Sequence, residues 1–154
     1  MTGRTTARAL RRGGKADRVY AAEFGLEPGR AFTTLREVQK YLDALAASPW
    51  WSERFPHVVR VEAVGIRSDA VDGVGRPEFH RLAGVVGISR NGRNELTVLH
   101  ETTHAVCDPD AGHGPRWART YLEMVYRVMG EVQWSALRAA FVEHGVALDP
   151  ASTR

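Results

Sequence analysis

The sequence has little cysteine, little lysine and no long apolar run. Cys107 is the single cysteine among 154 residues, so a disulfide framework within the chain is excluded. A reducing compartment fits this composition, and we expect a cytoplasmic protein. No apolar run approaches the roughly 18 residues that a membrane-spanning helix requires, and no apolar block of a secretory signal follows the arginine-rich N-terminus. We therefore expect no membrane partner.

Acidic residues are scarce at the N-terminus. The first 18 residues contain six Lys or Arg side chains and one acidic side chain, Asp17, whereas residues 19–154 contain 15 basic and 17 acidic side chains. The formal net charge of +3 therefore comes from the N-terminal segment. We interpret residues 1–17 as a basic, disordered arm, which is either a solvated tail or a weak contact for nucleic acid.

The rest of the chain has the composition of one globular domain, with 44% hydrophobic and 25% charged residues overall. We predict a single domain over residues 18–150 and a tail over residues 151–154. Apolar periodicity predicts helices that begin near Thr34, Asn94, Pro115 and Glu131, and alternation predicts strands over residues 58–66 and 79–89. This order predicts an α+β fold, with a small, mostly antiparallel sheet packed against the helix from Asn94 and two C-terminal helices.

The same apolar patterns also predict which side chains are buried. In the first strand, Val59, Val61 and Ala63 alternate with charged residues and should face the core. We interpret the Trp50–Trp51 pair as a plug at the edge of the core, in preference to a platform for stacking a ligand. The helical stripes should bury Leu96, Leu99, Thr103 and Val106, then Trp117, Tyr121, Val125 and Val128, and finally Leu137, Ala140 and Phe141.

Three of the six histidines lie within 14 residues, in HETTH at residues 100–104 and HGPRW at residues 113–117. Four residues of an α-helix advance about 6 Å and about 40° past a full turn, so His100 and His104 can bind one ion. Glu101 lies about 100° round the helix from His100, where its carboxylate can take a proton from a metal-bound water. Three protein ligands and one open position are typical of catalytic zinc.

The third ligand has more than one candidate. His113 follows a loop long enough to turn the chain back over the helix, and we favour it because histidine is the commonest partner for zinc in this arrangement. Glu123 on the next helix is the rival, while Asp108 and Asp110 are better explained as loop and cap residues. Cys107 is either a soft ligand, a redox switch or, as we favour, a small buried apolar residue. The alternative for the whole motif is two exposed helix histidines with an incidental glutamate between them.

The run HETTH…GHGPRW resembles the SprT-like and Spartan-like zinc metalloproteases. From about Arg18 through the final helix, the chain is also similar to a family of small metallohydrolases of high-GC Gram-positive bacteria and their phages, in the stretches RVYAAE and VQKYLDAL…PWW. The resemblance implies a minimal zincin-like fold, one Zn²⁺ per chain held by His100, His104 and His113, and Glu101 as the general base. It does not extend to the CxxC zinc ribbon of many SprT-like proteins, because the sequence has no CxxC pair.

We therefore expect a zinc-dependent hydrolase, first of all a metallopeptidase acting on a peptide or protein substrate. The stretch Gly84 to Ser89 is our candidate for the strand edge that holds the substrate, and His80, Arg116, Tyr121 or Tyr126 could stabilise the oxyanion. Two alternatives stay open. One is a hydrolase of non-peptide amides or esters, and the other is a non-catalytic, metal-stabilised module that binds nucleic acid or protein.

Overall fold

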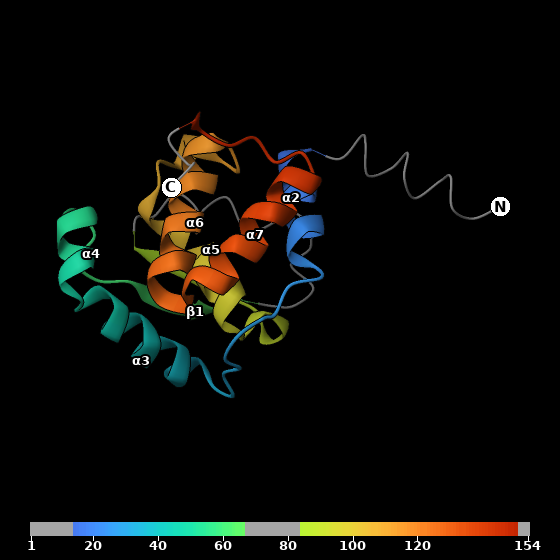
Figure 1. Ribbon diagram of the computed structural model, residues 1–154. Helices are drawn as coiled ribbons and strands as arrows, with labels where there is room; N and C mark the ends of the chain where they lie inside the picture. The colour runs from blue at the N-terminus through green and yellow to red at the C-terminus, as the bar shows by residue number, and fades with distance from the viewer. Residues whose placement is uncertain (1–13, 67–83, 151–154) are drawn as a thin grey trace. The chain divides into compact units, whose positions relative to one another are not determined.

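The computed structural model describes residues 14–66 and 84–150 (Figure 1). Within these ranges the chain forms six α-helices and one two-stranded sheet, which confirms the α+β class. Contacts divide the chain into two compact units, one of residues 28–110 and one of residues 1–27 with residues 111–154. None of the helices in the described ranges is both long and apolar enough to cross a membrane.

The sheet belongs to the unit of residues 28–110. Strands β1 (Glu62–Gly65) and β2 (Val85–Ile88) pair in parallel, with Glu62 opposite Val85. The prediction of a mostly antiparallel sheet is therefore wrong for the strands that the structure describes. Antiparallel neighbours can be joined by a tight hairpin, whereas parallel strands need a crossover of a dozen or more residues. The connection over residues 66–84 is long enough for a crossover, which is a length that also fits parallel pairing.

The predicted strand over residues 58–66 is shorter in the structure, and its first side chains point differently. Val59 is 84% exposed, whereas Val58 is buried, so the predicted alternation is wrong at this end. The reason is that β1 begins only at Glu62, so the alternation of a strand does not apply to residues 58–61. The Val58 carbonyl instead accepts a hydrogen bond of 2.6 Å from the indole of the buried Trp51. The burial of Trp51 also confirms its interpretation as a core residue. Residues 79–83 of the second predicted strand lie outside the described ranges.

Three helices complete this unit: α3 (Leu35–Ala46), α4 (Pro49–Arg54) and α5 (Glu95–Val106). Helix α3 contacts β1 and α4, and α5 contacts β2. Thr34 caps α3 by accepting a hydrogen bond from the Glu37 N–H group. Thus α5 lies against the strand that precedes it in the sequence, as in an α+β arrangement in which a helix covers a small sheet.

The other unit contains α2 (Lys15–Glu23), α6 (Pro115–Met129) and α7 (Glu131–Glu143). Helix α7 contacts both α2 and α6 (Figure 1). Helix α2 includes the last three residues of the predicted arm; residues 1–13 and the predicted tail, residues 151–154, lie outside the described ranges. The two C-terminal helices confirm the prediction, and their stripes bury Trp117, Tyr121, Val125, Leu137 and Phe141, while Val128 and Ala140 are half-buried.

Candidate metal centre

Helix α5 carries two of the three clustered histidines and is buried on most sides. Eight of its twelve residues are buried, including His100, Thr102 and Thr103. The hydroxyl groups of the two threonines donate hydrogen bonds of 2.6 and 2.7 Å to the carbonyls four residues earlier. Because these donors are satisfied within the helix, the polar HETTH segment can lie in the core without unpaired threonine hydroxyls.

The first turn of α5 is anchored to the chain segment before α3. The side chain of Asn94 caps the helix, as the sequence predicts. Two backbone carbonyls of the segment before α3 accept hydrogen bonds from the first two N–H groups of the helix. The bonds are Thr97 N–H to Asn94 Oδ1 (2.9 Å), Glu95 N–H to Arg30 O (2.8 Å) and Leu96 N–H to Pro28 O (3.0 Å). These are the donors that a helix leaves without an intrahelical partner. Their pairing therefore fixes where α5 begins.

A side-chain pair strengthens this anchor. The Tyr41 hydroxyl donates a hydrogen bond of 2.8 Å to Glu95 Oε2, and the Arg30 N–H donates one of 3.3 Å to Glu95 Oε1. Burial raises the pKa of Tyr41 well above its usual range, and the negative charge of Glu95 raises it further. Tyr41 is therefore neutral at physiological pH and able to donate its proton to this bond. Sequence periodicity could not pair two residues 54 positions apart.

The last turn of α5 is tied to the start of β2. The Gly84 N–H donates a hydrogen bond of 3.1 Å to the carbonyl of Ala105, which is one of the carbonyls that the helix end leaves open. Gly84 has a φ of 78°, and a Cβ atom at this position would lie 2.7 Å from the Arg60 carbonyl oxygen. Only glycine fits there without displacing the backbone. Both ends of the helix that bears His100 and His104 are thus held by backbone hydrogen bonds.

His113 lies in a loop between the short 3-10 helix η3 (Pro109–Ala111) and α6. A glycine flanks it on each side. Gly112 has a φ of 52°, and a Cβ atom on Gly114 would lie 2.9 Å from the Ala111 carbonyl oxygen. That carbonyl accepts a hydrogen bond of 2.9 Å from the Gly114 N–H. The two glycines therefore permit a tight turn that a bulkier residue would strain.

Two aromatic rings contact the imidazole of His113. The centroid of Trp117 lies 4.7 Å from that of His113 with an angle of 68° between the planes, and the centroid of Tyr20 lies 5.9 Å away with an angle of 63°. Both are edge-to-face arrangements, which aromatic pairs prefer. Trp117 belongs to the core of its unit, whereas Tyr20 on α2 was not among the residues that the sequence singled out for the site.

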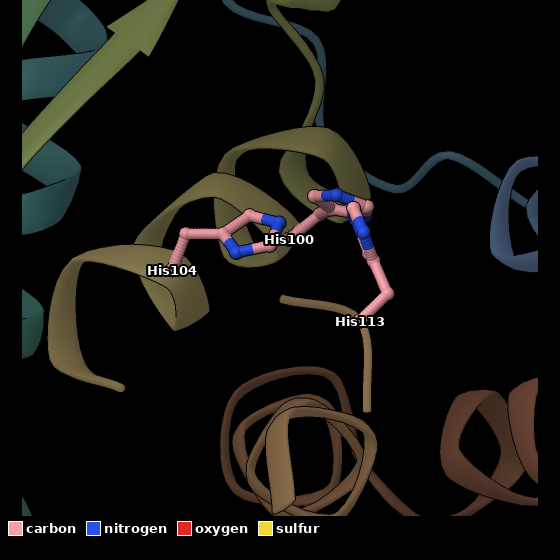
Figure 2. Close-up of side chains that lie close together, drawn as sticks. All are labelled: His100, His104 and His113. Atoms are coloured by element: carbon pink, nitrogen blue, oxygen red, sulfur yellow. The ribbon is translucent and has the colours of Figure 1, made fainter. Parts of the chain in front are cut away.

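The three histidines lie close enough to hold a metal ion. One ligand atom from each of His100, His104 and His113 lies within 4.8 Å of the others (Figure 2). The rings of His100 and His104 have centroids 5.1 Å apart, consistent with the four-residue spacing on one helix. His100 is buried, and the other two are half-buried. The predicted ligand cluster is thus present in the described part of the chain.

The other candidates fall outside this cluster. Among the described residues the group contains three histidines and neither Glu123, Asp108, Asp110 nor Cys107. The carboxylate of Asp108 accepts a hydrogen bond of 3.0 Å from the Asp110 N–H, as expected of a loop residue. Glu101 is half-buried on α5, between the two histidines in sequence.

The predicted oxyanion donors have different surroundings. Tyr121 is fully buried in the core and contacts the rings of Trp117 and Phe141. Tyr126 contacts Trp134, Arg116 is exposed at the start of α6, and His80 lies outside the described ranges. Full burial leaves Tyr121 without access to a substrate.

The chain was compared with models of known protein families, with curated proteins and with solved structures. None of these comparisons found a match. The resemblance of HETTH and HGPRW to SprT-like metalloproteases therefore stays a prediction from those residues.

Proposed function

We propose that the protein is a zinc-dependent hydrolase that cleaves peptide bonds. One observation carries the proposal: three imidazoles offer ligand atoms within 4.8 Å of one another, and a glutamate directly follows the first of them on the helix. Three nitrogen ligands with a neighbouring carboxylate are typical of hydrolytic zinc sites.

The donor set suits zinc. In a tetrahedral zinc site with Zn–N distances of about 2.0–2.1 Å, the nitrogen atoms lie about 3.4 Å apart. Ligand atoms within 4.8 Å reach that separation by small rotations about the side-chain bonds. Imidazole nitrogens are also ligands that zinc prefers, whereas Mg²⁺ and Ca²⁺ prefer oxygen. Three ligands leave one tetrahedral position for water or substrate.

In the reaction that we propose, a zinc ion supplies Lewis acidity toward a substrate carbonyl and a water molecule. Glu101 acts first as the general base and then as the general acid. Its carboxylate takes a proton from the attacking water and passes it to the nitrogen of the leaving amine. The helix that carries His100 and His104 is held at both ends by the backbone hydrogen bonds to Arg30, Pro28 and Gly84, which would fix the backbone of both residues during the reaction.

The sheet supports a peptide as the substrate. Strand β2 contacts α5 and pairs with β1 along one edge. Within residues 14–66 and 84–150, no strand pairs with its other edge. An extended peptide can add to such an edge through main-chain hydrogen bonds. We therefore assign the stretch Gly84 to Ser89 as the strand that holds the substrate backbone.

The test is Glu101→Gln, which keeps the size of the side chain and removes its ability to take a proton. We expect zinc binding to be retained and the cleavage of a mixture of unstructured peptides, read by mass spectrometry, to fall about 100-fold or more. Glu143→Gln, at the exposed end of α7, is the matched control and should leave cleavage unchanged. Equal cleavage by Glu101→Gln and the unaltered protein would contradict the proposal.

Two further measurements, with amide and ester substrates and by X-ray absorption, address the alternatives. Cleavage of amides or esters but not of peptides would assign the zinc chemistry to another substrate class. If zinc is bound and nothing is cleaved, X-ray absorption spectroscopy gives the ligand count. Four protein ligands would identify a structural site and a binding module.

A further inference from the structure

The third histidine is less restricted by its backbone than the other two. His100 and His104 belong to a helix that is held at both ends, whereas His113 lies between Gly112 and Gly114. Glycine has more conformational freedom than any other residue. The orientation of the His113 ring therefore depends more on its side-chain neighbours.

Those neighbours include one fixed ring and one accessible ring. Trp117 is fully buried and 4.7 Å from His113 between centroids, whereas Tyr20 is 45% exposed and 5.9 Å away. Helix α2 itself is well anchored. Val19, next to Tyr20, is fully buried, and α2 packs on α7. Tyr20 thus presents its ring to His113 from a firmly placed helix.

We propose that Tyr20 is a positioning residue for the metal centre, whose ring keeps the His113 imidazole in the orientation that binds the ion. Edge-to-face contacts have a preferred geometry, so the rings of Tyr20 and Trp117 together limit the rotation of the imidazole. This inference rests on the metal site of the proposed function, and it does not require that the protein hydrolyses anything.

Substitutions at Tyr20 test the inference, since its exposure makes them tolerable to the fold. We expect Tyr20→Ala to weaken zinc binding about 10-fold or more, the usual effect of removing a residue that orients a ligand. Tyr20→Phe keeps the ring and should keep the affinity. Tyr126→Ala is the matched control, because Tyr126 is 49% exposed and also makes an edge contact with a tryptophan, Trp134. Competition with a chromophoric chelator measures zinc affinity in each full-length variant.

A second measurement reports on the ring itself. In isotope-labelled protein without zinc, Tyr20→Ala should change the three-bond couplings that report the χ1 angle of His113 and leave those of His100 unchanged. Unaltered zinc affinity in Tyr20→Ala, or unaltered His113 couplings, would overturn the inference. An equal loss of affinity in Tyr126→Ala, or in Tyr20→Phe, would overturn it too, because the effect would then come from general destabilisation or from the hydroxyl. If the unaltered protein binds no zinc, the proposed function fails and this inference fails with it. If it binds zinc and cleaves nothing, the zinc affinities and the couplings still decide the role of Tyr20.

Discussion

Helix α5 and the loop around His113 hold their histidines in different ways. On α5 the helical repeat sets the separation of His100 and His104, and backbone hydrogen bonds at both helix ends hold the element. In the loop, Gly112 and Gly114 permit a tight turn, and neighbouring rings contact the imidazole. A ligand on a helix is therefore placed by regular local structure, whereas a ligand in a loop depends on particular neighbours.

The largest effect on stability should come from a substitution at Gly84, whose backbone holds the end of α5. In Gly84→Ala, the new Cβ atom would lie 2.7 Å from a backbone oxygen at a positive φ, and we expect a loss of about 3 kcal/mol in the free energy of unfolding. Gly145→Ala is the control. It has a φ of 70° but nothing within 4 Å of the added atom, so it should cost only about 1–2 kcal/mol. Urea denaturation measures both, and equal losses would contradict the role of close contact at Gly84.

A smaller effect is expected at the start of the same helix. Tyr41→Phe removes the hydrogen bond to Glu95 and should cost about 2 kcal/mol at neutral pH, since the acceptor is charged. The loss should depend on pH. The pKa of Tyr41 is raised in the folded protein, so the tyrosine stabilises the fold fully below the unfolded pKa of about 10, and this contribution is lost as the pH rises above that value.

Denaturation of both proteins at several pH values checks this prediction. The stability difference between the unaltered protein and Tyr41→Phe should shrink by about 1.4 kcal/mol for each pH unit above about 10. A difference that stays constant up to pH 11 would show that the folded tyrosine ionises as readily as the unfolded one.

The smallest effect on stability, and a clear effect on metal binding, should come from the loop. Gly112→Ala places a Cβ atom at a φ of 52° and should cost about 1–2 kcal/mol. Gly112→Asn should cost less, because asparagine tolerates this conformation. We expect zinc affinity to follow the same order, with alanine the weaker binder. Equal zinc affinity in the two variants would mean that the loop backbone does not control His113.

The features best predicted from the sequence are those that depend on residues close together in the chain. Asn94 as a helix cap and the four-residue spacing of His100 and His104 depend on neighbours within a turn, so pattern alone is sufficient to predict them. The burial of Leu96 and Leu99 follows from the same period.

What the sequence did not predict depends on distant segments. The direction of the β1–β2 pairing, the Tyr41–Glu95 bond and the contact of Tyr20 with His113 all join residues far apart in the chain. Periodicity carries no information about such partners. The glycines on both sides of His113 were a usable signal, because they indicate a tight turn at that position.

The most direct test of the three-histidine site is the metal content of protein purified without added metal. Elemental mass spectrometry would compare the unaltered protein with His104→Ala, His113→Ala and Glu123→Ala. We expect about one zinc per chain in the unaltered protein and in Glu123→Ala, and loss of zinc in both histidine variants. Absence of zinc from the unaltered protein even after reconstitution, or its retention in His113→Ala and loss in Glu123→Ala, would contradict this expectation.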